Sequence, residues 1–289
     1  MDPTFDPQLL AADLREVRRI YAGYFAKLTD AVWERPARRG AQEWNIRATV
    51  AHLCALSSAG LDSIKAARRG TTYVFAGLDD RYRFNAYNEA GIAAHLSCSR
   101  VELCTRWLDT LDEAVTIAAE LTPEQAAQTS AMPIYNRPVA LAEVLAIIMF
   151  HAGLHHSAQV ADPAGVPPLW TQLSPEIRHR VIGRVMRALS LLYRQDLGGD
   201  LRATIAFRID GTGGGSWYVQ VSPEKCLSGA GPVNRPTLTF HFRKTDEFCK
   251  LFTNRFNLPL ALLAGRLKLR GDLRLFTRFG SLFSVDAHP

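Results

Sequence analysis

Four of the eight histidines are spaced as metal ligands can be. His151 and His155 are four residues apart, so a helix presents both imidazoles from one face, one turn apart. This spacing lets two nitrogens reach one ion at ~2.1 Å, as in the HExxH metalloproteases. His52 lies in another helical segment and can supply a third ligand if the two helices face each other. Three neutral imidazoles suit zinc, iron, nickel or copper(II), and they leave coordination positions open, as catalytic sites do.

A single histidine on an apolar helix is more often a core residue with a backbone partner than a ligand. The run Val144–Phe150 before His151 is almost wholly apolar, which indicates that both histidines of the pair point into a core. Buried imidazoles need polar partners, and few acidic residues lie nearby in the sequence. This context favours metal binding. Cys54, two residues after His52, is turned away from the ligand face and is not expected to be a nucleophile.

The elements that must position these histidines are helices. Apolar residues recur at three- and four-residue steps, the helical period, in four segments of the first half of the chain: residues 8–28, 45–64, 82–119 and 141–161. Asn45 is the expected N-cap of the second helix. A short helix or turn at Thr122 and an irregular link or short hairpin at 133–138 separate the last two. Four long amphipathic helices predict a four-helix bundle.

The second half changes period and predicts an α+β domain. Prolines and a glycine at 163–168 break the chain, so we expect two domains, 1–165 and 166–289. Helices are predicted at 174–192, 245–252, 258–263 and 273–283, and strands at 201–209, 216–221, 236–242 and 267–270. The glycine-rich segment Asp210–Ser216 lacks the Gly-Lys-Ser/Thr of a phosphate loop, so we interpret it as a hairpin turn.

Length and composition agree with two globular domains. The chain has 289 residues, 47% hydrophobic and 21% charged, which excludes disorder as its main character. No stretch approaches the ~20 apolar residues of a membrane span, and the acidic start is not a signal peptide. The odd number of cysteines, five, without CxxC spacing, predicts reduced thiols and a cytoplasmic location.

Charge divides unevenly along the chain. Residues 1–165 carry 16 Lys and Arg against 19 Asp and Glu, whereas residues 166–289 carry 18 against 9, a net of +9. Only six of the 34 basic residues are lysine, which indicates a GC-rich genome rather than a phosphate-binding design. This argues against a nucleic acid as partner. With no spanning segment we expect no membrane partner either, and we assign the basic second half to binding of an acidic small molecule.

Two segments of the first half resemble the DinB-like metal-binding bundle superfamily. Trp44 to Leu53 is similar to its second-helix signature, a tryptophan eight residues before a histidine-leucine pair. His151 to Gln159 is similar to its last-helix signature, a ligand, three residues, then a histidine. The resemblance places the metal ligands at His52, His151 and His155. Mycothiol-dependent maleylpyruvate isomerases of this superfamily have a glutamate where this chain has His151. Many members place the last ligand three residues before a glutamine, which here selects His156 instead, through a helix bulge; otherwise His156 is a neighbour that contacts substrate.

The second half resembles a sterol-carrier-protein-2-like (SCP2-like) domain. The matching stretch runs from Phe207–Gly211 and Trp217–Val221 through Pro236–Phe240 to Gly265–Asp272. A DinB-like bundle followed by an SCP2-like domain is the architecture of the maleylpyruvate isomerase and mycothiol S-transferase group, and the two resemblances cover nearly the whole chain.

Together these features predict a metal-dependent thiol S-transferase or isomerase. A divalent metal, zinc first with iron or nickel as alternatives, activates the thiol, and the resemblance implies mycothiol as cosubstrate. The thiolate adds to a small electrophile such as a natural-product intermediate or an unsaturated acid. We assign catalytic roles to His156 and Arg266, and cofactor-binding roles to Asn85, Asn88, Glu89 and Arg270. A simpler interpretation is that the two asparagines and Glu89 lie on a solvated helix face. Surface exposure is likewise the simpler interpretation of the two arginines.

Two other functions are compatible with the sequence. The second half can be an apolar-ligand (sterol or lipid) binding module beside a structural metal, its cavity lined by Phe240, Phe242, Phe248, Phe252, Leu258, Leu260, Leu262 and Leu263. These side chains fill a core equally well. Alternatively, an iron ion in the bundle supports hydrolase or oxygenase chemistry. The oligomeric state is not readable from the sequence.

Overall fold

The computed structural model describes residues 5–36, 44–253 and 255–284, which form two compact units. The first unit is Met1–Pro133 with Pro138–Leu173, and the second is Ile134–Arg137 with Ser174–Pro289. The division thus follows Leu173, eight residues after the predicted boundary. The reason is the short helix α9 (Leu169–Gln172), whose Leu169 and Trp170 are buried against other helices of the first unit.

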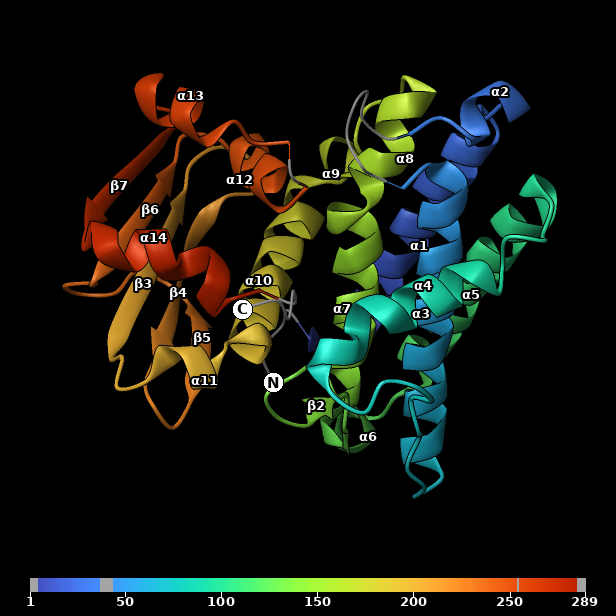
Figure 1. Ribbon diagram of the computed structural model, residues 1–289, viewed down its shortest axis with the longest axis horizontal. Helices are drawn as coiled ribbons and strands as arrows, with labels where there is room; N and C mark the ends of the chain where they lie inside the picture. The colour runs from blue at the N-terminus through green and yellow to red at the C-terminus, as the bar shows by residue number, and fades with distance from the viewer. Residues whose placement is uncertain (1–4, 37–43, 254, 285–289) are drawn as a thin grey trace. The chain divides into compact units, whose positions relative to one another are not determined.

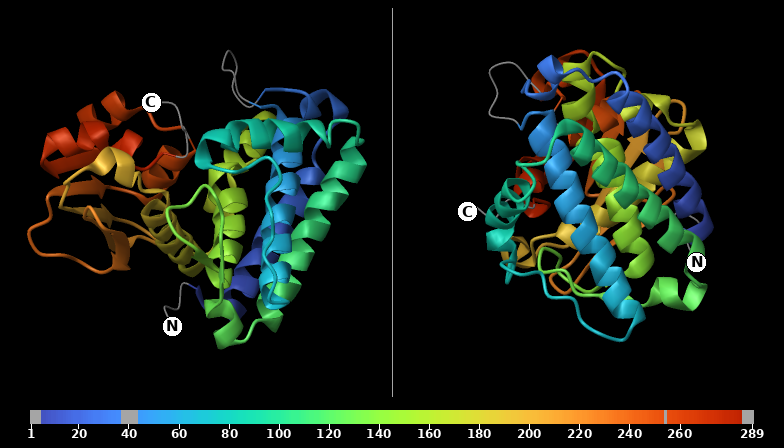
Figure 2. Two further views of the ribbon diagram at one scale, coloured as in Figure 1. Left: turned by 60° about the horizontal axis from the view of Figure 1, so that its bottom comes forward. Right: turned by 90° about the vertical axis from the view of Figure 1, so that its right-hand side faces the viewer.

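The first unit is the predicted four-helix bundle. Its four columns are α1, α3, α5 and a last helix made of α7, a π-helical turn η3 and α8, and they lie side by side in Figures 1 and 2. The elements are α1 (Pro7–Phe25), α2 (Asp30–Trp33), α3 (Ile46–Arg68), the 3-10 turn η2 (Arg81–Arg83), α4 (Phe84–Ala93), α5 (Arg100–Glu120), α6 (Pro123–Ala127), β1 (Thr129–Ser130), β2 (Val139–Ala140), α7 (Leu141–Phe150), η3 (His151–His155) and α8 (Ser157–Ala164).

Side-chain caps fix where these helices begin. Asn45 caps α3 as predicted, its Oδ1 accepting from Ala48 N at 2.8 Å. The prediction of one helix over 82–119 is wrong, because α4 and α5 are separate. A capping box begins α5: Ser99 Oγ accepts from Glu102 N, and the Glu102 carboxylate accepts from Ser99 N. This reciprocal cap satisfies the first N–H groups of α5 and so begins a new helix. The hydrophobic period does not show this break, because it continues from α4 into α5.

Helix α4 lies across α3 (Figure 1). The crossing is tight at Gly91, where an added Cβ would lie 2.9 Å from Ala55 Cβ. Ala55 is three residues after His52 and therefore on a neighbouring position of the same helix face. A glycine at position 91 thus lets α4 cover the helix that carries the candidate ligand.

The second unit is α+β, as predicted. Its sheet has the order β5-β4-β3-β6-β7, with β3 and β6 parallel and the other neighbours antiparallel. The elements are α10 (Pro175–Leu192), α11 (Gln195–Gly198), β3 (Ala203–Ile209), β4 (Gly215–Val221), β5 (Cys226–Ala230), β6 (Leu238–Phe242), α12 (Thr245–Phe252), α13 (Leu258–Leu263), β7 (Leu267–Gly271) and α14 (Leu273–Leu282). Strand β5 was not predicted, because its sequence CLSGA lacks the β-branched and aromatic residues typical of strands.

One face of this sheet forms the core of the second unit. Residues alternate buried and less buried along β3, β4 and β6, as expected for a half-buried sheet. Phe240 stacks on Phe207 and lies beside Phe242, which in turn contacts Phe248 edge to face. Phe240, Phe242 and Phe248, proposed above as cavity lining, therefore pack as core residues.

One helix in the described residues is long and apolar enough to cross a membrane by length and composition alone. It is Leu141–Ala164, and 72% of its most apolar window is buried inside the protein. The expectation that no stretch approaches a span was therefore too strict. This burial is what a central helix of a bundle shows, so the finding is weak evidence for a membrane.

The contact at Gly91 predicts a pair of opposite stability effects. Gly91→Ala should destabilise the first unit by about 1–3 kcal/mol, because the methyl group forces α4 away from Ala55. Gly23→Ala is the matched control: Gly23 is also helical, but it faces open space and should gain about 0.5–1 kcal/mol from helix propensity. Urea unfolding followed by circular dichroism measures both. Equal effects of the two substitutions would show that the crossing is not tight.

Candidate metal centre

Three imidazoles of the first unit converge on one point. His52 of α3, His151 at the start of η3 and His156 directly after η3 offer nitrogens that all lie within 4.8 Å of one another. His52 Nε2 and His151 Nε2 are 3.2 Å apart. His52 and His156 are buried, whereas His151 is half-buried.

The π-helical turn brings His156, rather than His155, into this cluster. The N–H of His156 donates to the carbonyl of His151 at 3.0 Å, an i→i+5 bond that accommodates one more residue per turn than an α-helix. His156 therefore occupies the place one turn beyond His151 that residue i+4 would take in an α-helix. Turns of this kind inside α-helices are frequent at functional sites.

Tyr21 of α1 supports the backbone of this turn. Because the His156 N–H bonds to His151, it is not available to the carbonyl of Ala152, its partner in a regular α-helix. The buried Tyr21 hydroxyl donates to this Ala152 carbonyl at 2.9 Å. Burial also raises the pKa of Tyr21 well above its usual value, so the hydroxyl stays a donor. Tyr21 was not predicted from the sequence, where its signal is a hydroxyl within the buried apolar stripe of the first helix.

A hydrogen bond orients the His156 ring. Its Nδ1 is bonded to Gln159 Oε1. An amide oxygen only accepts, so Nδ1 carries the proton and Nε2 is left with a free lone pair. A ligand histidine commonly donates its other ring N–H to such a partner, which fixes its tautomer and orientation.

The indole of Trp44 covers part of the cluster. Its ring centroid lies 4.7 Å from that of His52 and 5.9 Å from that of His156, nearly parallel to the latter at 23°. Trp44 directly precedes the Asn45 cap of α3, so the start of that helix positions the indole. The tryptophan of the second-helix signature therefore lies against two of the three histidines.

The three histidines are held uncharged. Burial lowers the pKa of His52, His151 and His156 well below its usual value, and the neighbouring imidazoles lower it further. Neutral imidazole is the form that binds a metal ion.

The donor set fits a divalent ion. Two nitrogens each ~2.1 Å from one ion lie about 3.0–3.4 Å apart at angles near 90–109°, and the 3.2 Å between His52 and His151 falls in this range. Without a proton or an ion between them, two lone pairs at this distance would repel.

His155 lies outside the cluster. Its side chain is exposed, and its ring stacks on that of His151 at a centroid distance of 5.9 Å. The expectation that His155 is the third member of the group thus differs from the structure, which gives that place to His156. The physical reason is the π-turn, which shifts every later residue by one position around the helix. The alternative of a ligand brought in by a helix bulge matches the observed geometry.

The other residues assigned from the sequence are not gathered at this cluster. On α4, Asn85 and Glu89 are exposed and Asn88 is buried. In the second unit, Arg266 Nη1 donates to both carboxylate oxygens of the buried Glu247 at 3.2 Å, so it is already paired. Arg270 is exposed on β7. Their functional roles remain predictions.

Cys54 is buried, which raises the pKa of its thiol to about 12 and makes it a poor nucleophile.

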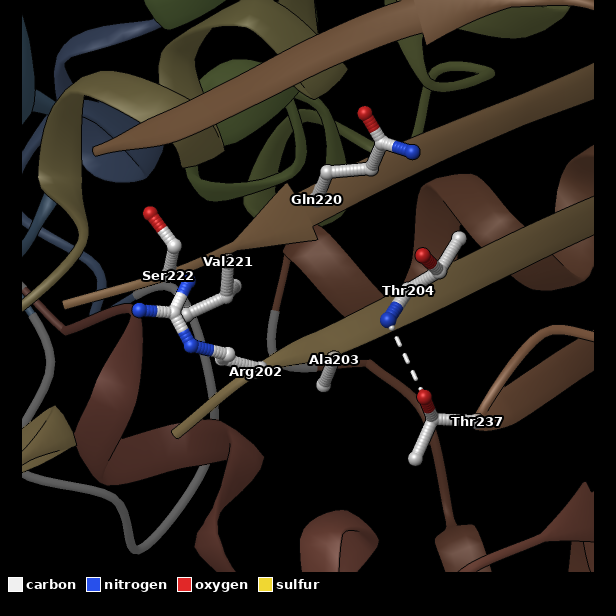
Figure 3. A pocket seen from close by; sticks show the side chains of 7 residues that line it. All are labelled: Arg202, Ala203, Thr204, Gln220, Val221, Ser222 and Thr237. Atoms are coloured by element: carbon white, nitrogen blue, oxygen red, sulfur yellow. Dashed lines mark hydrogen bonds between the residues drawn. The ribbon is translucent and has the colours of Figure 1, made fainter. Parts of the chain in front are cut away.

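The second unit has a surface pocket of about 340 Å³. Figure 3 shows that it lies over the ends of β3 and β4, with Thr204 N bonded to Thr237 Oγ1 at 3.1 Å. Its lining is mostly polar: Arg202, Ala203, Thr204, Gln220, Val221, Ser222 and Thr237. It brings together none of the predicted site residues.

Fold and site together define a four-helix bundle with a three-histidine candidate metal centre, followed by an α+β unit. The sequence profile of the DinB superfamily matches residues 13–158, half of the chain, and the chain belongs to this superfamily. The profile of the SCP-2 sterol transfer family matches residues 190–284. Both parts of the predicted fusion are therefore confirmed.

Individual proteins resemble the chain more distantly. The crystal structure of a mycothiol-dependent maleylpyruvate isomerase superposes with a TM-score of 0.56 at 11% identity, over 88% of this chain and 90% of that one, which shows a shared fold. Hydroxysteroid dehydrogenase-like protein 2 of Bos taurus is 23% identical over 114 residues, and that of Homo sapiens over 113. Each match spans 39% of this chain but only 27% of the dehydrogenase-like protein.

The cluster predicts which histidine substitutions abolish metal binding. His52→Ala, His151→Ala and His156→Ala should each lose the ion, because two imidazoles hold it much more weakly than three. His155→Ala should keep about one equivalent. Inductively coupled plasma mass spectrometry on untagged protein measures this, with circular dichroism as a check of folding. Retention of the ion by His156→Ala and its loss by His155→Ala would contradict the assignment of His52, His151 and His156 as the three ligands.

The support from Tyr21 predicts a selective effect on affinity. Tyr21→Phe removes the donor to Ala152, so it should cost about 1–3 kcal/mol of stability and weaken zinc binding about tenfold by loosening η3. Tyr24→Phe is the control: it removes a similar bond, to Pro167 O at 2.6 Å, which does not involve η3. Competition with a chromogenic chelator gives the zinc affinity. Equal affinities in the two variants would contradict a role for Tyr21 at the turn.

Proposed function

We propose that this protein is a metal-dependent thiol S-transferase or isomerase that uses a low-molecular-weight thiol. The observation that carries the proposal is the convergence of three neutral imidazoles in a DinB-superfamily bundle. Two nitrogens come from a short helical segment and one from a facing helix, so the donors are preorganised. A protein that shares this fold is described as mycothiol-dependent, which supports mycothiol as the thiol.

The histidines would hold a divalent ion, zinc in the first instance, through His52, His151 and His156. Such an ion supplies the positive charge that deprotonates a thiol, whose pKa is otherwise ~8.5. The imidazoles themselves add no charge, so they leave this effect of the ion undiminished. Trp44 and the buried surroundings of His52 exclude water from one side, which strengthens electrostatic interactions there.

The half-buried His151 marks the side from which a cosubstrate can approach. In the transfer reaction the thiol loses its proton to solvent or buffer, and its sulfur forms a bond to one carbon of the activated C=C double bond of a small unsaturated acid or natural-product intermediate. The π bond breaks, and the adjacent carbon takes a proton from solvent. In the isomerisation the same carbon–sulfur bond forms, the former double bond rotates as a single bond, and the carbon–sulfur bond then breaks as the C=C bond re-forms, so the thiol is regenerated. Both reactions begin from the thiolate, and the histidines serve both equally.

Two alternative functions, an iron-dependent oxygenase and an apolar-ligand carrier, predict different results in metal analysis and in assays of thiol dependence. Iron in purified protein, with oxygen consumption, would favour oxygenase chemistry. An apolar-ligand carrier would bind lipid without any thiol. The mutual packing of Phe240, Phe242 and Phe248 favours a filled core over a lipid cavity at these residues.

The proposal predicts thiol-dependent turnover. Zinc-loaded full-length protein is incubated with mycothiol and a panel of unsaturated acids, maleylpyruvate among them. Loss of free thiol then reports transfer, and a changed electrophile at constant thiol reports isomerisation. His151→Ala should lower kcat/KM about a thousandfold, since charge stabilisation by an ion contributes several kcal/mol. His155→Ala is the matched control and should retain binding of the ion. Absence of thiol-dependent turnover in zinc-loaded protein, over the whole panel, would refute the proposal.

A further inference from the structure

Helix α13 of the second unit exposes an unusually apolar surface. Its sequence, Leu258–Leu263, contains no polar side chain, and Ala261 is its one buried residue. Leu260, Leu262 and Leu263 are 52%, 37% and 87% exposed. Single exposed leucines are ordinary, but adjacent ones on one short helix form a contiguous patch, and such patches mark interaction sites.

Exposed cations lie on the segments next to this helix. Arg243 N donates to Arg266 O at 3.0 Å, which places Arg243 and the adjoining Lys244 next to the C-terminal end of α13. Lys268 and Arg270 lie on β7, the strand against which α13 packs. All four are exposed, and within the described ranges none has an ion-pair partner.

The acidic groups near these cations are already engaged. Glu247 is buried and paired with Arg266, and Asp246 is paired with Lys250. Asp210 bonds His241 at 2.7 Å, and Asp272 caps α14. No carboxylate of the described residues lies within ion-pair distance of these cations, and residues 166–289 carry a net charge of +9, so positive charge is in excess in this unit.

We propose that α13 is a membrane-interface element that docks on anionic lipid bilayers. Its leucines enter the boundary between headgroups and acyl chains, while Arg243 and Lys244 stay at the lipid phosphates. The exposed cations favour a bilayer over other partners, because an apolar patch beside unpaired cations complements a surface that is both apolar and anionic. The expectation of no membrane partner rested on the absence of a spanning segment, and a peripheral helix needs none. The proposal does not depend on the metal centre.

Flotation of the full chain with vesicles tests it. Wild type should bind vesicles that contain phosphatidylglycerol, bind phosphatidylcholine vesicles much less, and dissociate as salt is raised. The double variant Leu260→Ser, Leu263→Ser should bind at least about tenfold more weakly. Its control is Leu197→Ser, Leu227→Ser, which changes two exposed leucines of the same unit outside α13 and should bind like wild type.

A second pair of variants isolates the charge. Lys268 and Arg270 also protect the edge strand β7 from pairing with other strands, so the test targets Arg243 and Lys244 instead. Arg243→Gln, Lys244→Gln should weaken binding to anionic vesicles about 20-fold. The control Arg202→Gln, Lys225→Gln removes the same net charge from exposed positions elsewhere in the unit and should have a much smaller effect. The proposal fails if wild type binds neither vesicle, if either pair behaves like its control, or if the serine variant instead abolishes self-association of the chain.

Discussion

The cost of burying imidazole nitrogens constrains the first unit more than any other interaction. A neutral imidazole has one N–H and one lone pair, and both need partners in a low-dielectric interior. Gln159 accepts the N–H of His156, but the cluster still directs nitrogens of three rings toward one point. A shared cation satisfies several lone pairs at once. The π-turn, its Tyr21 hydrogen bond and the Trp44 cover are the features that make this convergence possible within a helical bundle.

Much of the fold is predictable because it depends on local rules. The bundle follows from apolar residues at helical spacing, and the start of α3 from the capping chemistry of Asn45. The strand pair β3 and β4 follows from β-branched and aromatic residues on either side of a glycine-rich turn. His52 and His151 were identifiable for a similar reason, since each is a polar residue within an apolar helical segment that must lie in the core.

The remaining features depend on contacts between distant segments. The spacing of the histidines does not distinguish an α-turn from a π-turn, and the one local signal for His156 is Gln159, three residues further on. The rest of the difference lies in the Tyr21 hydroxyl, 131 residues away, that satisfies the Ala152 carbonyl. For this reason His155 and His156 could not be separated by spacing. The break between α4 and α5 and the strand β5 were missed on similar grounds, because a cap and a neighbouring strand β4 outweigh local periodicity and composition there.

The choice of a third imidazole also bears on the proposed chemistry. The resemblance to the maleylpyruvate isomerases implies a carboxylate at the position where this chain has His151. A carboxylate would cancel one of the two charges of a divalent ion, whereas three imidazoles cancel none. With an ion held by His52, His151 and His156, the greater positive charge would lower the pKa of a thiol at the site further and thereby raise the fraction of thiolate. It also lowers the intrinsic nucleophilicity of that thiolate, which falls with its pKa. A site of this composition is therefore best matched to highly reactive electrophiles, which react even with a weakly nucleophilic thiolate. It also favours anionic electrophiles, because the same positive charge attracts them.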